Sequence, residues 1–261
     1  MNQFFNFFLT SNVYISFAAS LLYLHYAFVL EKNFFLSTPL FVFGGTYISY
    51  HLVRFIPYQK GEIIEGEFSM WYQQHSLFFK LSILITFGIC LYAVFDLMRM
   101  QIFWMAIAFL IVILYENILL KNFNLRGISY LKPFIISLAW TLVCVGFHSY
   151  SLFYLVDCFL FIGLLCIPFD IKDKEFDQRQ NVKTLAHLFL KNHFLYYLLI
   201  FLFSLYLLFM TTCLEYHYSY FTIFTMFLLY GLGLYKMKNS TLFYYCLDGI
   251  IIIRSLDLIY H

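Results

Sequence analysis

Long apolar segments with almost no charge follow one another through most of this chain, and they constrain its fold more than any other feature. Several of them reach the roughly 18 apolar residues that are needed to cross a bilayer. Only 11% of the 261 residues are charged, whereas a soluble domain carries about 25%. Strands of a β-barrel would instead show short segments of about ten alternating residues. The sequence therefore predicts an all-α integral membrane protein.

The apolar segments divide into about nine predicted transmembrane helices, which we expect to form one domain over residues 1–261 and a bundle around a central cavity. Most connections are short, so neighbouring helices should be antiparallel. Gly44, Gly45, His51 and Arg54 interrupt the second segment, which is the weakest of the set. The predicted spans are 12–30, 34–57, 78–98, 101–120, 131–148, 151–169, 193–212, 216–235 and 241–259.

Basic residues are distributed unevenly between the two sides of this predicted bundle. All but three of the 16 lysines and arginines lie on the side of the longest polar connections, 58–77, 121–130 and 170–192. Basic residues of short loops stay on the cytosolic side of membrane proteins. We therefore expect a multi-pass protein of the cell (inner) membrane with its N-terminus in the cytosol.

Charge and cysteine usage exclude several other classes of protein. A net charge of +2 gives no basic footprint for nucleic acid, so membrane lipid rather than nucleic acid is the expected surroundings. The six cysteines stand singly inside apolar segments, without a CxxC pair. This spacing is typical of small buried apolar residues rather than of disulfides or a zinc site.

The densest group of charges follows the sixth predicted span. Residues 168–185 read PFDIKDKEFDQRQNVKTL and place Asp170, Asp173 and Asp177 at i, i+3 and i+7. These positions share one face of a helix. Three neighbouring carboxylates repel one another unless a cation or basic side chains neutralise them. A solvated loop of mixed charge beside the membrane is the alternative interpretation.

The surroundings of these carboxylates favour a phosphate-binding site. Mg²⁺ binds carboxylate oxygens and bridges them to the phosphates of a substrate. Arg179 and Lys183 follow within the same segment, and basic side chains of this kind bind phosphate oxygens directly.

Residues 168–185 resemble the second aspartate-rich motif of the UbiA superfamily of intramembrane prenyltransferases. In that motif D-x-x-D-x-x-x-D is followed by a basic residue and by a [GN]-[IV]-K-T-L stretch, which here is NVKTL at 181–185. The motif follows the sixth of nine predicted spans, as it does in the family. Residues 126–140 (RGISYLKPFIISLAW) more loosely resemble the family's basic and aromatic loop before the fifth helix. With the span count, the resemblance covers essentially the whole chain.

The resemblance implies a bundle that binds Mg²⁺ and a prenyl diphosphate at its cytosolic end and transfers the prenyl group to an aromatic or other lipid-soluble acceptor. Cations would neutralise the departing diphosphate, and aromatic rings would stabilise the allylic carbocation. The residues assigned to the site are Asp170, Asp173 and Asp177, for catalysis and metal binding, and Lys183, Arg179, Arg54, Lys132 and Arg126, for diphosphate binding.

The first aspartate-rich motif of the family has no counterpart in this chain. It should end the second span with a pattern close to N-D-x-x-x-D, but residues 46–54 read TYISYHLVR and contain no carboxylate. Three explanations are open. In the first, the site holds a single Mg²⁺ and Arg54 binds the diphosphate by its charge. In the second, the glutamates of residues 62–67 supply the missing metal ligands. In the third, the chain is a non-catalytic relative that binds an isoprenoid. A small membrane transporter is a further alternative.

Polar residues at a similar depth in other spans complete the expected site. Glu116 and Asn117 lie near the end of the fourth span, and Asp248 lies near the start of the ninth. Ionisable groups inside a bilayer usually face the interior of a bundle. We expect Glu116, Asn117, Asp248 and His51 to line a cavity beneath the aspartate-rich loop. An interhelical ion pair of Arg54 with Glu116 or Asp248 explains the same residues equally well.

Overall fold

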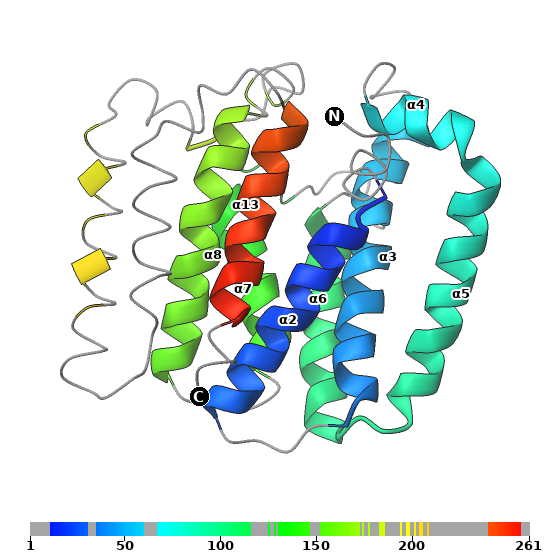
Figure 1. The fold of residues 1–261 in the computed structure, drawn as a ribbon, viewed down its shortest axis with the longest axis horizontal. Helices are drawn as coiled ribbons and strands as arrows, with labels where there is room; N and C mark the ends of the chain where they lie inside the picture. Colours follow the sequence, from blue (N-terminus) through cyan, green and yellow to red (C-terminus); the bar gives the residue numbers. More distant parts are fainter. Residues whose placement is uncertain are drawn as a thin grey trace.

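The computed structural model describes residues 11–30, 35–59, 67–115, 130–146, 152–172 and 240–256, together with isolated positions between residues 125 and 208. These described residues form helices and no strand, which confirms the all-α prediction for this part of the chain. The long helices run side by side between the two ends of a bundle (Figure 1). The helices are α2 Val13–Val29, α3 Ser37–Gln59, α4 Glu67–Gln74, α5 Ser76–Val94, α6 Arg99–Tyr115, α7 Lys132–Cys144, α8 Leu152–Lys172 and α13 Ser240–Ser255.

All but two of the predicted spans correspond to one of these helices. The predicted spans 193–212 and 216–235 lie outside the described residues, apart from isolated positions in the first of them. One described helix was not predicted. Helix α4 lies in the connection 58–77, and its eight residues are too few to cross a bilayer, which takes about 20.

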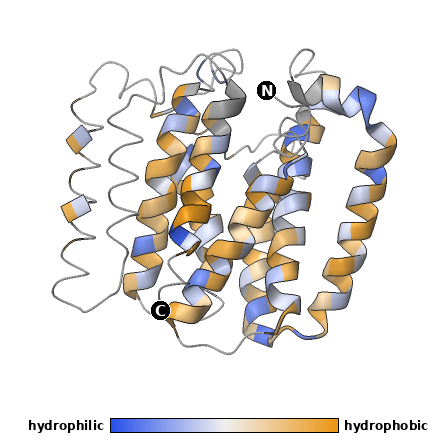
Figure 2. Cartoon of the chain, in the orientation of Figure 1, coloured by the Kyte–Doolittle hydropathy of each residue, from blue (hydrophilic) through white to orange (hydrophobic). Residues whose placement is uncertain are grey.

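Helix α5 is strongly apolar and yet mostly exposed. Only 22% of an 18-residue apolar stretch of this helix is buried. Its exposed side chains include Leu84, Ile85 and Tyr92. Figure 2 shows hydrophobic residues along this helix, at the edge of the described bundle. Among the described helices, α5 and α8 are long and apolar enough to cross a membrane. The core helix of a soluble protein would bury such a surface.

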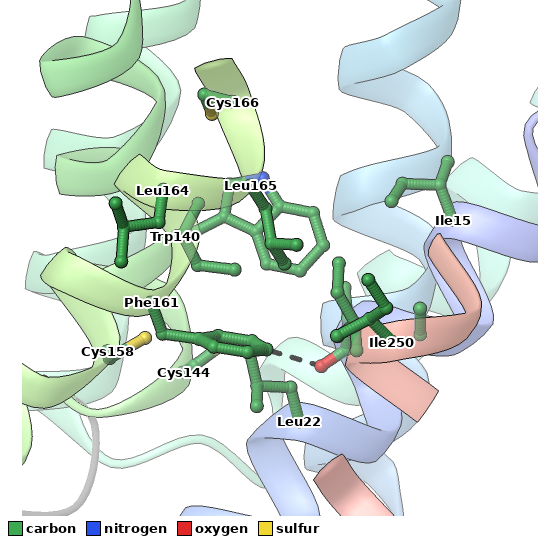
Figure 3. Packing of buried hydrophobic residues seen from close by; sticks show 14 of the residues in the cluster. Ile15, Leu22, Trp140, Cys144, Cys158, Phe161, Leu164, Leu165, Cys166 and Ile250 are labelled. Atoms are coloured by element: carbon green, nitrogen blue, oxygen red, sulfur yellow. Dashed lines mark hydrogen bonds between the residues drawn. The ribbon is translucent and has the colours of Figure 1, made fainter. Parts of the chain in front are cut away.

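The centre of the bundle is formed by α2, which packs against α3, α7 and α13. Its inner side carries small and aromatic residues that are fully buried, such as Ala18, Tyr23 and Tyr26. Small residues let neighbouring helices approach closely. In the close-up of the core, Phe161 of α8 lies near Leu22 and Ile250 (Figure 3).

A glycine sets the close contact between α3 and α5. The sequence pattern marked Gly44 and Gly45 as interruptions, but α3 runs through both as one helix. A Cβ at position 44 would lie 2.4 Å from Sγ of Cys90 and 3.1 Å from Cγ2 of Thr86, both on α5. At Gly45 the nearest atom is Cε1 of Phe41, at an ordinary 3.8 Å. Only the first glycine is therefore required by the packing.

Gly44→Ala should destabilise the protein because its methyl group overlaps α5, and overpacking of this kind costs about 1–3 kcal/mol. Gly45→Ala is the matched control and should leave the stability nearly unchanged. Adding Cys90→Ala to Gly44→Ala removes the nearer clashing atom and should restore part of the loss. Thermal unfolding of the detergent-solubilised protein measures all three. Equal losses of stability in Gly44→Ala and Gly45→Ala would contradict a close contact between α3 and α5 at Gly44.

Candidate functional site

A buried lysine joins the start of α7 to the end of α8. Nζ of Lys132 lies 3.0 Å from Oδ1 of Asp170 and 3.0 Å from Oδ2 of Asp177. Lys132 is 7% exposed, Asp170 1% and Asp177 0%. The carboxylates of Asp170 and Asp177 therefore lie close together, and one ammonium group neutralises part of their charge. We refer to these three residues as the lysine bridge.

The local structure of α7 does not explain why a lysine stands at position 132. Lys132 is the first residue of the helix, and Pro133 follows it in the first turn, where a missing N–H is tolerated. The N-terminus of a helix carries a partial positive charge, and a charge of the wrong sign there costs about 0.3–1 kcal/mol. The compensating interaction comes from the carboxylates of Asp170 and Asp177. The position of Lys132 is thus determined by tertiary contacts.

The chain before α7 is held in place by the segment after α8. The backbone N–H of Tyr130 donates to the carbonyl of Lys183 at 2.8 Å. Tyr130 has a φ of 65°, a left-handed conformation that is uncommon for residues other than glycine. Thr184, next to Lys183, is fully buried. The two segments that the sequence analysis selected, 126–140 and 168–185, therefore meet in space.

A second polar group lies beside the lysine bridge. Arg54 of α3 interacts electrostatically with the buried carboxylate of Asp248 on α13. Tyr50, one turn before Arg54, forms a hydrogen bond with the indole of Trp140 and lies within electrostatic reach of Asp248 and Cys166. Cys166 in turn lies within electrostatic reach of Asp170 and Lys132. Electrostatic interactions through Tyr50 and Cys166 therefore link the second polar group to the bridge.

His51 lies among aromatic rings. It is fully buried, and its Nδ1 lies 3.3 Å from Nδ2 of Asn12. Its ring meets those of Tyr47 and Phe79 edge to face, at centroid distances of 4.3 and 4.9 Å, and it stacks on Trp71 of α4. His51 therefore faces α4 and α5.

The structure describes part of the predicted site. It brings together Lys132, Asp170 and Asp177, and it places Arg54 beside Asp248. The side chain of Lys183 is exposed, next to the backbone that contacts Tyr130. The predicted site residues that lie outside the described residues are Asp173, Arg179, Arg126, Glu116 and Asn117.

A further buried ion pair was not predicted from the sequence. Arg254 of α13 donates to the carboxylate of Asp157 near the start of α8, and the hydroxyl of Tyr26 donates to the same oxygen at 2.8 Å. The guanidinium carbon of Arg254 lies 4.1 Å from the ring centroid of Phe161. The only sequence signal was a charged residue inside each of two apolar segments. This pair lies toward the ends of α8 and α13 that are remote from Lys132.

The described carboxylates fit a lysine better than they fit Mg²⁺. The ion needs oxygen ligands at about 2.0–2.1 Å in near-octahedral geometry, and the ammonium of Lys132 fills the position between Asp170 and Asp177. Within the described ranges, no group of three His, Cys, Asp or Glu residues is arranged to hold a metal ion. The Mg²⁺ prediction therefore stays a prediction for the segment that includes Asp173.

Comparison of the chain with models of protein families, with curated proteins and with solved structures gives no match. The interpretation of the site consequently depends on its residues and on the motif in the sequence.

Lys132→Met should lower the free energy of unfolding by about 3–5 kcal/mol, because two buried carboxylates lose their counter-charge. Adding Asp170→Asn and Asp177→Asn removes those charges and should recover most of the loss. Lys80→Met, at an exposed lysine of α5, is the control and should change the stability little. Denaturant unfolding in detergent measures each variant. A triple variant no more stable than Lys132→Met alone would contradict the bridge.

Proposed function

We propose that this chain is a multi-pass membrane protein that binds a prenyl diphosphate beside the lysine bridge and transfers the prenyl group to a lipid-soluble acceptor. The observation that carries the proposal is the contact between residues 126–140 and 168–185. Each of these segments resembles a part of the UbiA prenyltransferase site. The packing of the consecutive helices α7 and α8 brings the two segments to one end of the bundle, and the lysine bridge and the Tyr130–Lys183 hydrogen bond join them there.

The membrane setting is supported by the exposed apolar surface of α5. A soluble protein rarely exposes a contiguous apolar face of this size, whereas lipid covers it without cost. Hydroxyl groups inside the bundle also bond to their own helix, as Ser137 and Thr141 of α7 do to the carbonyls four residues earlier. Such bonds satisfy polar groups where water is absent. We propose about nine spans with a cytosolic N-terminus.

Basic side chains around the bridge supply the attraction for a diphosphate. The charge of Lys132 is compensated by two carboxylates, so the exposed Lys183 and the half-buried Arg54 are the described cations that we assign to the phosphates. On cleavage of the carbon–oxygen bond, the electron pair leaves with the diphosphate and these cations stabilise its charge. The acceptor then forms the new bond to the allylic carbon and loses a proton. Tyr50 is hydrogen-bonded to Trp140 and lies within electrostatic reach of Asp248, and the rings of both residues are suited to stabilise a carbocation.

Binding without transfer is the second candidate function. It is favoured by the absence of carboxylates from residues 46–54 and by the position of Lys132 between Asp170 and Asp177. Both features reduce the capacity of the site for metal-assisted cleavage. A transporter is less well supported, because the core between the two described ion pairs is apolar and includes Leu22, Phe161 and Ile250.

The proposed orientation predicts opposite accessibility for two exposed positions. In a background without native cysteines, Lys183→Cys should react with a membrane-impermeant maleimide only from the cytosolic side. Asp96→Cys, in the exposed turn between α5 and α6, should react only from the other side. Labelling of intact cells and of inverted vesicles measures both. Reaction of the two positions from one side would contradict the topology.

Prenyl diphosphate binding should depend on the basic residues at the site. Lys183→Ala should weaken binding about tenfold, or about 1.4 kcal/mol, because an alanine cannot replace a charge that contacts phosphate. Glu65→Ala is the control in the predicted 62–67 loop and should change binding little. A radiolabelled prenyl diphosphate, assayed in membranes with several aromatic acceptors and with and without Mg²⁺, measures binding and transfer. No binding to the wild-type protein at any Mg²⁺ concentration would reject the proposal, and binding without transfer would favour the second candidate.

A further inference from the structure

We propose that Lys132 is the resident cation of the Asp170–Asp177 pair, so that this pair holds an ammonium group in place of a divalent metal ion. The pair is part of the site proposed above, and in that respect the inference rests on the proposed function. It adds that the counter-charge of the pair comes from a side chain of the protein. It also predicts that removing the lysine creates a divalent-cation site.

The geometry of the bridge carries this inference. Nζ of Lys132 lies at the same 3.0 Å distance from an oxygen of each carboxylate. Both distances are those of a charge-assisted hydrogen bond, so the ammonium is bound by both residues at once. A metal ion at the midpoint of the two oxygens would lie less than 3.0 Å from Nζ, and the two positive charges would repel each other. The lysine and the metal therefore compete for one position.

Burial favours the lysine over a metal ion at this position. The side chains of Lys132, Asp170 and Asp177 are 9%, 1% and 0% exposed. A metal ion that entered would displace the ammonium group, which would then be buried without a counter-charge. Burial of an uncompensated charge is strongly unfavourable. The metal ion would also have to lose the water that Mg²⁺ gives up reluctantly. The bridge should therefore resist replacement by a divalent cation.

Removal of the lysine should reverse this preference. Without the ammonium, two carboxylates on one face of a helix repel each other in a poorly solvated position, and a divalent cation is the simplest group that neutralises both. At the second polar group, Arg54 likewise interacts electrostatically with a buried carboxylate, that of Asp248. In both groups, the protein supplies the positive charge from its own side chains.

Mn²⁺ alone, added to the purified full-length protein in lipid nanodiscs, tests the inference. Electron paramagnetic resonance gives bound Mn²⁺, and thermal unfolding gives stabilisation, because a ligand that binds the folded state raises its melting temperature. We expect Lys132→Ala to bind Mn²⁺ at least tenfold more tightly than the wild type does. Mn²⁺ should raise the melting temperature of Lys132→Ala but not that of the wild type. Lys132→Ala combined with Asp170→Asn and Asp177→Asn is the matched control and should lose the gained binding.

Two results would overturn the inference. One is tight Mn²⁺ binding by the wild-type protein that disappears in Asp170→Asn/Asp177→Asn, since the carboxylates would then hold metal with the lysine present. The other is no gain of Mn²⁺ binding in a folded Lys132 variant. Lys132→Gln, which keeps most of the side-chain volume, replaces Lys132→Ala if the alanine variant does not fold. Prenyl diphosphate is absent from these measurements, so their outcome is independent of whether the protein binds or transfers a prenyl group.

Discussion

Three buried charges hold together the start of α7 and the end of α8, and the surrounding site depends on them. Lys132 stands where the dipole of its own helix disfavours a cation, and Asp170 and Asp177 stand close enough to repel each other. Each carboxylate becomes acceptable through Lys132, and Lys132 becomes acceptable through the two carboxylates. Because the three residues come from separate segments, their attraction fixes where the loop before α7 lies relative to the chain after α8.

The rest of the bundle is consistent with a protein that has lipid as its solvent. Helix α5 turns an apolar face outward, and Gly44 lets α3 approach it closely. The remote ends of α8 and α13 are joined by Asp157 and Arg254, whose charges are buried together. Within the described residues, the buried charged side chains thus lie in groups of opposite charge. Because lipid does not solvate a separated charge, each buried charge must lie beside its partner. This requirement restricts how the helices can pack.

Much of the fold follows from the sequence because the described long helices coincide with its long, almost uncharged segments. A spanning segment must satisfy its own backbone hydrogen bonds, so a long apolar segment indicates a helix. Helix α4 was not predicted because a segment of eight residues is too short and too polar to read as a long apolar helix. Gly44 and Gly45 looked like a break in α3, since a glycine at a helix contact cannot be distinguished by sequence from one that ends a helix.

The site was less predictable than the fold. The spacing of Asp170 and Asp177 predicted a shared helix face, and the structure places both carboxylates at one ammonium group. Their partner lies 45 residues from Asp177, and no local rule connects Lys132 to either carboxylate. The same limit applies to Arg254 and Asp157, which are 97 residues apart. Such pairs arise from tertiary packing, and Lys132 was expected to bind phosphate rather than aspartate.

The most direct test of this account is a cryo-electron microscopy map of the protein in a lipid nanodisc, at a resolution that defines side chains. It measures the position of the Lys132 ammonium relative to the two carboxylates without any substitution. We expect Nζ within hydrogen-bonding distance of both Asp170 and Asp177, near the 3.0 Å described here. A lysine directed away from both carboxylates, with Asp170 and Asp177 open to water, would contradict the account.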